Sequence, residues 1–355
     1  MFQASLRRAV GVAAIAAAAV LASCSTPEPE PAPPPPPPPP PPALSLNSGV
    51  AEAASIYVAF IRDVSTIQAG FPDAASIQAA LRRGASYQPD QLSRGMIAYG
   101  AVLALQSPDY VAGVRTFAVD PAQRAEVVAR IIADPAYAAT LPGADKAAGL
   151  IVETLSKDAA AFTAIGEAVE EDAYTIQGRT DPRRRWSVVH ITDRDQRLEA
   201  VKALSANQML PSAEESARLF AAANAGSGLG LTGGQSGPPY TPAVVNSLAI
   251  AALAALGAGG DDARANTEAL EIEQNSEFCL NMSKLMLFQC LAASRPSYED
   301  MFCVGRHVLR DLGTCTAQNL APVQSRPASA VEGGAPVAAE AVQATTAALN
   351  SGASR

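Results

Sequence analysis

Five cysteines and two histidines are the residues of this 355-residue chain whose types suit covalent or metal chemistry. In an exported protein, four clustered cysteines favour disulfides and allow three pairings. A zinc site can also be drawn from three of them and His307, but these cysteines are ten or more residues apart, whereas structural zinc sites usually carry closely spaced pairs. We therefore predict no metal and no other cofactor. The clustered cysteines are Cys279, Cys290, Cys303 and Cys315, whereas Cys24 stands alone.

Two predicted helices position the clustered cysteines. The apolar pattern predicts a long helix from Ala263 to about Ala293, a turn at Arg295-Pro296 and a final helix from Ser297 to about Gly313. In an antiparallel arrangement of these helices, the turn lies between Cys290 and Cys303. We therefore expect a C-terminal helical hairpin that disulfides hold together.

The spacing of the cysteines selects one pairing. Cys279 and Cys315 lie eleven and twelve residues outside Cys290 and Cys303. Along a helix these offsets are roughly 16 and 18 Å, so the outer pair comes level whenever the inner pair does. A bond from Cys279 to Cys290 within one helix would have to span the same ~16 Å, beyond the ~7 Å limit between Cα atoms, and the crossed pairing fails similarly. We predict that Cys290 bonds to Cys303 and Cys279 to Cys315.

This nested pairing resembles, in geometry, the disulfides of the coiled-coil-helix-coiled-coil-helix proteins. Those proteins space each pair nine apart, whereas this chain uses ten and eleven. The resemblance therefore concerns the arrangement of the hairpin and carries no function.

The N-terminal segment has the features of a secretory signal. Arg7 and Arg8 supply positive charge, and residues 10–21 are almost all apolar. The apolar run is too short to span a membrane, which takes roughly 20 such residues. Small residues then lead to Cys24, so we expect cleavage before it.

Leu21-Ala22-Ser23-Cys24 resembles the lipobox of bacterial lipoproteins. The resemblance implies that residues 1–23 are removed and that Cys24 is acylated, which makes the membrane the first partner of the chain. Ser25 stands where an aspartate would signal retention in the inner membrane, which implies an outer-membrane protein facing the periplasm. An inner-membrane position, an uncleaved anchor and an ordinary secretory signal are the alternatives.

A nearly pure proline segment follows the anchor. Ten consecutive prolines, Pro33 to Pro42, fix φ and remove backbone donors, so the segment is expected to be an extended polyproline rod. At ~3.1 Å per residue, residues 26–43 reach roughly 50 Å. The segment is interpreted as a spacer that holds a domain away from the bilayer.

Composition and periodicity predict an all-α globular body. The chain is 48% hydrophobic and only 17% charged, which suffices for a sizeable core. Its formal charge of −8 disfavours nucleic acid as a partner. Apolar residues recur at helical spacing, most clearly from Ala144 to Gln177, where Asp158 and Asp172 interrupt the apolar seam. We predict a multi-helix bundle with the disulfide-stapled antiparallel hairpin at its C-terminal end.

Helix boundaries and composition shifts give the predicted organisation of the chain. Asp120, Asp193 and Ser212 each precede an apolar helical pattern with a Gln or Glu three residues later, as N-caps do. Pro242 to Leu256 is apolar all round, which predicts a buried core helix. The predicted segments are a signal peptide (1–23), a lipid anchor and spacer (24–47), an N-terminal helical lobe (48–224), a Gly/Pro-rich loop (225–239), a C-terminal helical lobe (240–320) and a disordered tail (321–355).

Other polar groups are interpreted as structural. Glu167, Glu170 and Glu171 are expected on a solvated helix face, because a catalytic carboxylate pair needs burial. His190 lacks an identifiable nucleophile near it in the sequence. Residues 183–185, three arginines, are expected in a solvated turn, with contact to lipid headgroups or an acidic partner as the alternative. The G-x-G-x-x-G match at residues 228–233 does not follow a strand.

The globular part resembles alanine-rich helical lipoproteins of Gram-negative bacteria. The resemblance is carried by the lipobox and by residues 276–279 and 298–303, and it brings no functional residues with it. Because no catalytic constellation is found, the predicted function is a non-catalytic binding or tethering domain of the cell envelope with a protein partner. A periplasmic lipid carrier and a cell-wall hydrolase are the alternatives.

Overall fold

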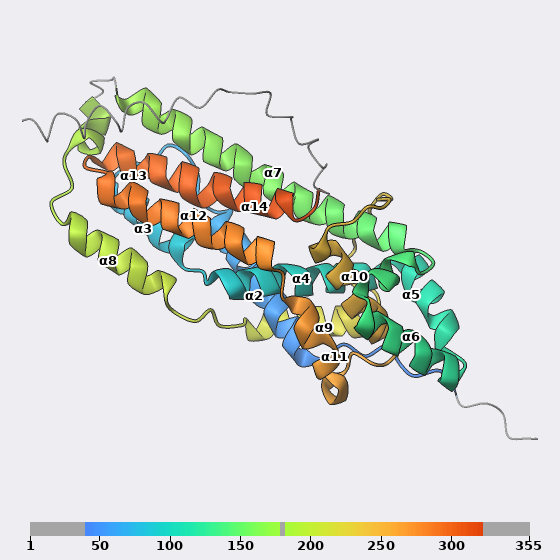
Figure 1. The fold of residues 1–355 in the computed structure, drawn as a ribbon. Coiled ribbons are helices and arrows are strands. Elements are labelled where there is room, and N and C mark those ends of the chain that lie inside the picture. The colour runs from blue at the N-terminus through green and yellow to red at the C-terminus, as the bar shows by residue number, and fades with distance from the viewer. Residues whose placement is uncertain (1–39, 178–181, 322–355) are drawn as a thin grey trace, which may run out of the picture. The chain divides into compact units, whose positions relative to one another are not determined.

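A computed structural model of the chain describes residues 40–177 and 182–321 (Figure 1). Within these ranges the chain is built from helices, and its only β pairing consists of two isolated bridges. The predicted all-α class is confirmed. The same residues contain no helix long and apolar enough to cross a membrane. Cys24, the predicted signal peptide, most of the predicted spacer and the tail after Ala321 lie outside the described residues.

Helices follow one another with short connections along the chain. The first group is α2 (Ser48–Val64), α3 (Ala74–Ala85), α4 (Pro89–Leu105), α5 (Pro108–Arg115), η1 (Thr116–Ala118), α6 (Pro121–Ala133), η2 (Pro135–Thr140), α7 (Ala144–Gln177), η3 (Pro182–Val188), α8 (Arg194–Ser205) and α9 (Ala213–Ala225). The second group is α10 (Pro242–Ala255), η4 (Asp261–Ala263), α11 (Ala265–Glu268), η5 (Ala269–Glu271), α12 (Gln274–Ala293), α13 (Ser297–Val304), η6 (Gly305–Arg310) and α14 (Asp311–Gln318).

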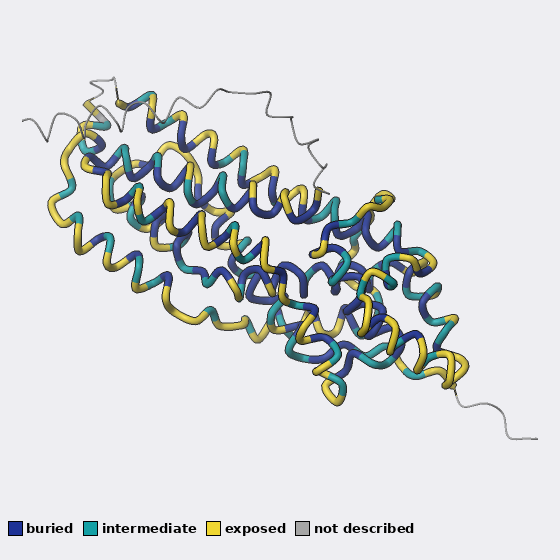
Figure 2. Tube along the Cα trace, viewed as in Figure 1, coloured by how far each residue is buried: buried dark blue, intermediate teal, exposed yellow. Residues whose placement is uncertain are grey.

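Two apolar helices, α4 and α10, form the centre of the core. Figure 2 shows both as almost continuously buried. Residues 248–255 of α10 are all 0% exposed, because α10 packs on α4 and η2 with small alanine side chains between larger ones. The prediction of a buried helix over residues 242–256 is confirmed.

The helices before and after residues 225–239 share this core. The described residues 41–177 and 182–321 belong to one compact unit, and α10 packs on α4 while α13 and α14 pack on α7. The Gly/Pro-rich segment is a loop over the surface of this shared core, whereas the sequence predicted a separator between two lobes. The apolar faces of the two groups of helices therefore cover each other.

Glycines allow α7 to approach the C-terminal helices closely. A Cβ atom at Gly305 would lie 2.8 Å from the carbonyl oxygen of Gly166, and one at Gly313 would lie 2.7 Å from that of Ala159. The helix over 297–318 includes a π-helical turn, η6, and continues to Gln318 instead of ending near Gly313 as predicted. Gly313 therefore serves helix packing here and does not end the helix.

The C-terminal hairpin has the predicted disulfides. Cys279 bonds to Cys315 and Cys290 to Cys303, each with Cα atoms 5.7 Å apart. The helix before the turn begins at Gln274 rather than Ala263, so that part of the prediction was wrong. The helix begins there because Glu273 is its N-cap. The Glu273 carboxylate accepts hydrogen bonds from the backbone N–H groups of Asn275 and Ser276.

Two of the three predicted helix caps are present. The Asp120 carboxylate accepts from Ala122 and Gln123, and the Ser212 hydroxyl accepts from the backbone of Glu215. Asp193 precedes α8 but makes no capping bond, and its backbone (φ −104°, ψ 47°) is not in the extended conformation that N-cap residues usually adopt. The predicted cap at Asp193 was therefore wrong.

Candidate binding groove between α3, η3 and α8

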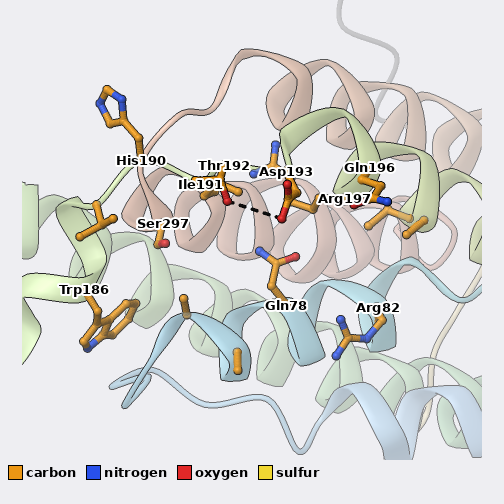
Figure 3. A pocket seen from close by; sticks show the side chains of 15 residues that line it. Gln78, Arg82, Trp186, His190, Ile191, Thr192, Asp193, Gln196, Arg197 and Ser297 are labelled. Carbon is orange, nitrogen blue, oxygen red and sulfur yellow. Dashed lines mark hydrogen bonds between the residues drawn. The ribbon is translucent and has the colours of Figure 1, made fainter.

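A groove of about 690 Å³ lies between α3, η3 and α8, with residues 189–193 as one wall (Figure 3). Its surface is mainly apolar, and Val189 at its wall leaves 60% of its own surface exposed. Covering such side chains removes apolar surface from water, so the groove favours a ligand that brings apolar groups. The apolar lining residues are Ala74, Ala75, Trp186, Val189, Ile191, Ala200 and Val201.

A buried ion pair fixes the floor of this groove. Nη1 of Arg197 donates to both carboxylate oxygens of Asp300 at 2.7 Å, and Arg197 also donates to the carbonyl of Leu291. Nε2 of Gln78 also donates to Asp300, at 2.8 Å. The hydroxyl of Ser294 donates to Asp300 as well, at 2.6 Å. Asp300 is 0% exposed and Arg197 8%. These bonds join α3, α8, α12 and α13, so the floor is rigid before any ligand arrives.

Burial also shapes the protonation of this floor. It raises the pKa of the Asp300 carboxyl, while the hydrogen bonds from Ser294, Arg197 and Gln78 and the charge of Arg197 oppose the rise. These donors and the charge of Arg197 offset part of the cost of burying the carboxylate. Removal of Arg197 is therefore expected to weaken the floor more than removal of a solvated charge.

Two N–H groups at the groove, Nε of Arg197 and Nε1 of Trp186, are buried and have no acceptor among the described residues. An unpaired buried donor costs free energy, which an acceptor recovers. Because solvent does not reach either N–H group, both lie beneath the surface of the groove.

Residues of hydrolytic types line the groove without forming a catalytic set. Ser297, His190 and Asp193 all lie along it, and a backbone bridge joins His190 to Pro296 next to Ser297. No hydrogen bond links the three side chains in the described structure, and in Figure 3 the imidazole of His190 points away from Gln78 at the floor. A nucleophile and its base must lie within hydrogen-bond reach. The three side chains therefore do not form a hydrogen-bonded set among the described residues.

The cysteines predicted as site residues are structural. All four lie in disulfides, so the zinc site drawn with His307 lacks its thiolates. His307 contacts the carboxylate of Asp311 at 3.2 Å instead. The described residues contain no group of three or more acidic, cysteine or histidine side chains suited to hold a metal ion.

Two residues expected in solvent are engaged in ion pairs. Glu170 is 8% exposed and accepts from Nη1 of Arg310 at 2.9 Å, because η6 packs across α7 at this point. Arg184 pairs with Asp172 on α7 and so attaches η3 to that helix. The predictions of a solvated face at Glu170 and a solvated turn at Arg184 were therefore wrong.

The groove is not apparent from the sequence. Its floor is formed by residues that lie far apart in the sequence. Arg197 is 103 residues from Asp300, and Gln78 is 222 residues from it. The one available signal in the sequence is the β-branched run of residues 187–191. No protein-family model matches the chain, and no curated protein or solved structure matches it, so its function has to be inferred from this geometry.

Proposed function

We propose that the chain is a membrane-anchored lipoprotein of the cell envelope whose helical body binds a protein partner without catalysis. The groove between α3, η3 and α8 is the observation that supports it. The groove combines apolar walls with a floor that a buried ion pair holds together. A surface with these properties suits an apolar stretch of another polypeptide.

The proposed anchor is a lipid on Cys24, followed by the proline-rich spacer. The lipobox resemblance supports outer-membrane attachment with the body facing the periplasm. A polyproline spacer of roughly 50 Å would let the body reach partners away from the bilayer. Metabolic labelling with palmitate tests the anchor, since labelling should be lost in Cys24→Ser.

The two alternative functions receive less support from the described residues. A lipid carrier needs an enclosed apolar cavity, yet α10, the helix that suggested one, is filled by close packing. A cell-wall hydrolase needs two carboxyl groups across a cleft. The groove contains Asp193 as an exposed carboxylate, whereas Asp300 below it is bound by Arg197.

Site-specific photocrosslinking in cells tests the proposal. A photoreactive amino acid at Val189, inside the groove, should capture a discrete protein adduct from the envelope. The same amino acid at Ile132 of α6, an exposed apolar residue outside the groove, is the matched control. Equal adducts from both positions, or none from Val189, would contradict a protein-binding groove.

A further inference from the structure

Asp158 and Asp172 both interrupt the apolar seam of α7, but only one of them has partners. Asp172 binds Arg184 and accepts a hydrogen bond from the backbone N–H of Gly70 at 2.9 Å. For Asp158, no described residue donates a hydrogen bond or forms an ion pair. A half-buried carboxylate without a partner is costly, and protein interiors normally pair such a group.

Asp158 lies at a cleft of about 240 Å³ between α2 and α7. Tyr99 of α4 contributes to the lining, and its ring stacks with that of Tyr57 of α2 at a centroid distance of 5.9 Å. Phe162 lies one helical turn after Asp158 and also lines the cleft. The carboxylate therefore stands beside aromatic rings at a small opening.

The charges around this cleft are already matched, except that of Asp158. Arg62 of α2 and Arg218 of α9 both bind Glu215, which is 5% exposed. Burial raises the pKa of Asp158 to about 6, and no neighbouring cation lowers it. The titratable groups near Asp158 are Tyr57 and Tyr99. Arg62 also lines the cleft, but its guanidinium is bound to Glu215, which Arg218 also binds.

We propose that this cleft binds a small molecule that carries an ammonium group, with Asp158 as its counter-ion and the ring of Tyr99 beside it. A carboxylate together with aromatic faces is the chemistry that recognises primary and quaternary ammonium ions. The ion would supply the partner that the chain itself does not give to Asp158. The site is separate from the groove and does not depend on the function proposed for it.

The volume of the cleft limits the ligand. About 240 Å³ lies below the range of about 300–1,000 Å³ typical of pockets for drug-sized molecules. A single headgroup or a small amine suits this space, whereas a peptide or an acyl chain does not. Choline is therefore a suitable probe of the chemistry.

Calorimetric titration of the full chain, purified in a maltoside detergent, with choline tests the proposal. Its uncharged carbon isostere, 3,3-dimethylbutan-1-ol, is the matched control ligand. Choline should bind and the isostere should bind at least tenfold more weakly. Asp158→Asn should lower the affinity tenfold or more, and Tyr99→Leu should lower it by ~2- to 30-fold, the range of a cation–π contact.

The pH dependence gives a second readout. Choline keeps its charge at every pH, whereas the Asp158 carboxyl has to be ionised to attract it. Affinity should therefore be nearly constant above pH 7 and fall about tenfold by pH 5, one unit below the pKa of about 6. Asp158→Asn should abolish that dependence.

Three results would overturn the proposal. They are equal binding of choline and its isostere, an Asp158→Asn variant that binds as well as the wild type, or no binding of choline by a folded chain at tens of millimolar. Circular dichroism and the thermal transition of each variant establish that it is folded.

Discussion

Asp300 and Asp158 are two carboxyl groups on helices of one fold, and their surroundings are opposite. Asp300, below the groove, receives hydrogen bonds from Arg197, Gln78 and Ser294 and is completely buried. Asp158, at the cleft between α2 and α7, has no donor among the described residues. Burial raises the pKa of both groups. The comparison teaches that a carboxylate removed from water holds the fold together where donors surround it, and carries an uncompensated cost of burial where they do not.

The largest expected effect on stability comes from breaking the buried ion pair between Arg197 and Asp300. Arg197→Met should lower the free energy of unfolding by ~3–5 kcal/mol, because it leaves Asp300 buried without its cation. Denaturant titration at pH 7.5 measures the loss. Arg62→Met is the matched control, since its partner Glu215 keeps Arg218 and the Arg62 side chain is 66% exposed. A loss below ~1 kcal/mol, the size of a surface pair, would mean that the pair does not support the floor.

Removing the inner disulfide should loosen the groove before the cleft. Leu291, whose carbonyl binds Arg197, follows Cys290, and Asp300 lies three residues before Cys303. The bridge closes a loop with a sequence separation of 13, so the double change Cys290→Ala and Cys303→Ala should cost about 3 kcal/mol.

Hydrogen exchange of the disulfide-deleted chain sharpens this comparison. Amides of α8 and α13 should exchange faster, while those of α2 and α7 around Asp158 keep their protection. Faster exchange at α2 and α7 with α8 unchanged would show that the disulfide does not stabilise the groove.

The smallest effect on stability is expected from a substitution of Asp158, which should stabilise the protein instead of destabilising it. The folded-state pKa of about 6 lies above the usual 3.8, so the folded state holds the proton more tightly and loses stability as pH rises from about 4 to 6. Asp158→Asn should therefore stabilise the protein at pH 7.5 by about 1 kcal/mol, after allowance for partial exposure, and change nothing at pH 4. Thermal unfolding at both pH values measures this. A destabilised variant at pH 7.5 would indicate a partner for Asp158.

Elements set by local pattern could be predicted from the sequence. The helix from Ala144 to Gln177 has the predicted bounds, since its apolar period continues without a strong breaker. The disulfide pairing follows from helical rise and one turn at Arg295-Pro296. Both depend on distances along the chain, which the sequence contains directly.

Features that depend on the packing of distant segments could not be predicted. Asp300 reads in the sequence as an acidic residue in the first turn of a helix, and Arg197 as an exposed helical arginine, yet they meet across 103 residues. The sequence predicts a solvated carboxylate at Glu170, whereas in the fold η6 packs across α7 and Arg310 binds it. The sequence marks Asp158 as a break in an apolar seam, but only the fold places Tyr57 and Tyr99 beside it.

The most direct test of the central claim is to fill the groove without disturbing its floor. Ala75 of α3 is an exposed lining residue, so Ala75→Trp should occupy the groove at little cost in stability. Ala164→Trp, at an exposed position on α7, is the control. The measurement is the yield of the protein adduct from a photoreactive amino acid at Val189. We predict that Ala75→Trp removes the adduct while the thermal transition stays unchanged and Ala164→Trp keeps the adduct; an undiminished adduct in folded Ala75→Trp would contradict the groove as the binding site.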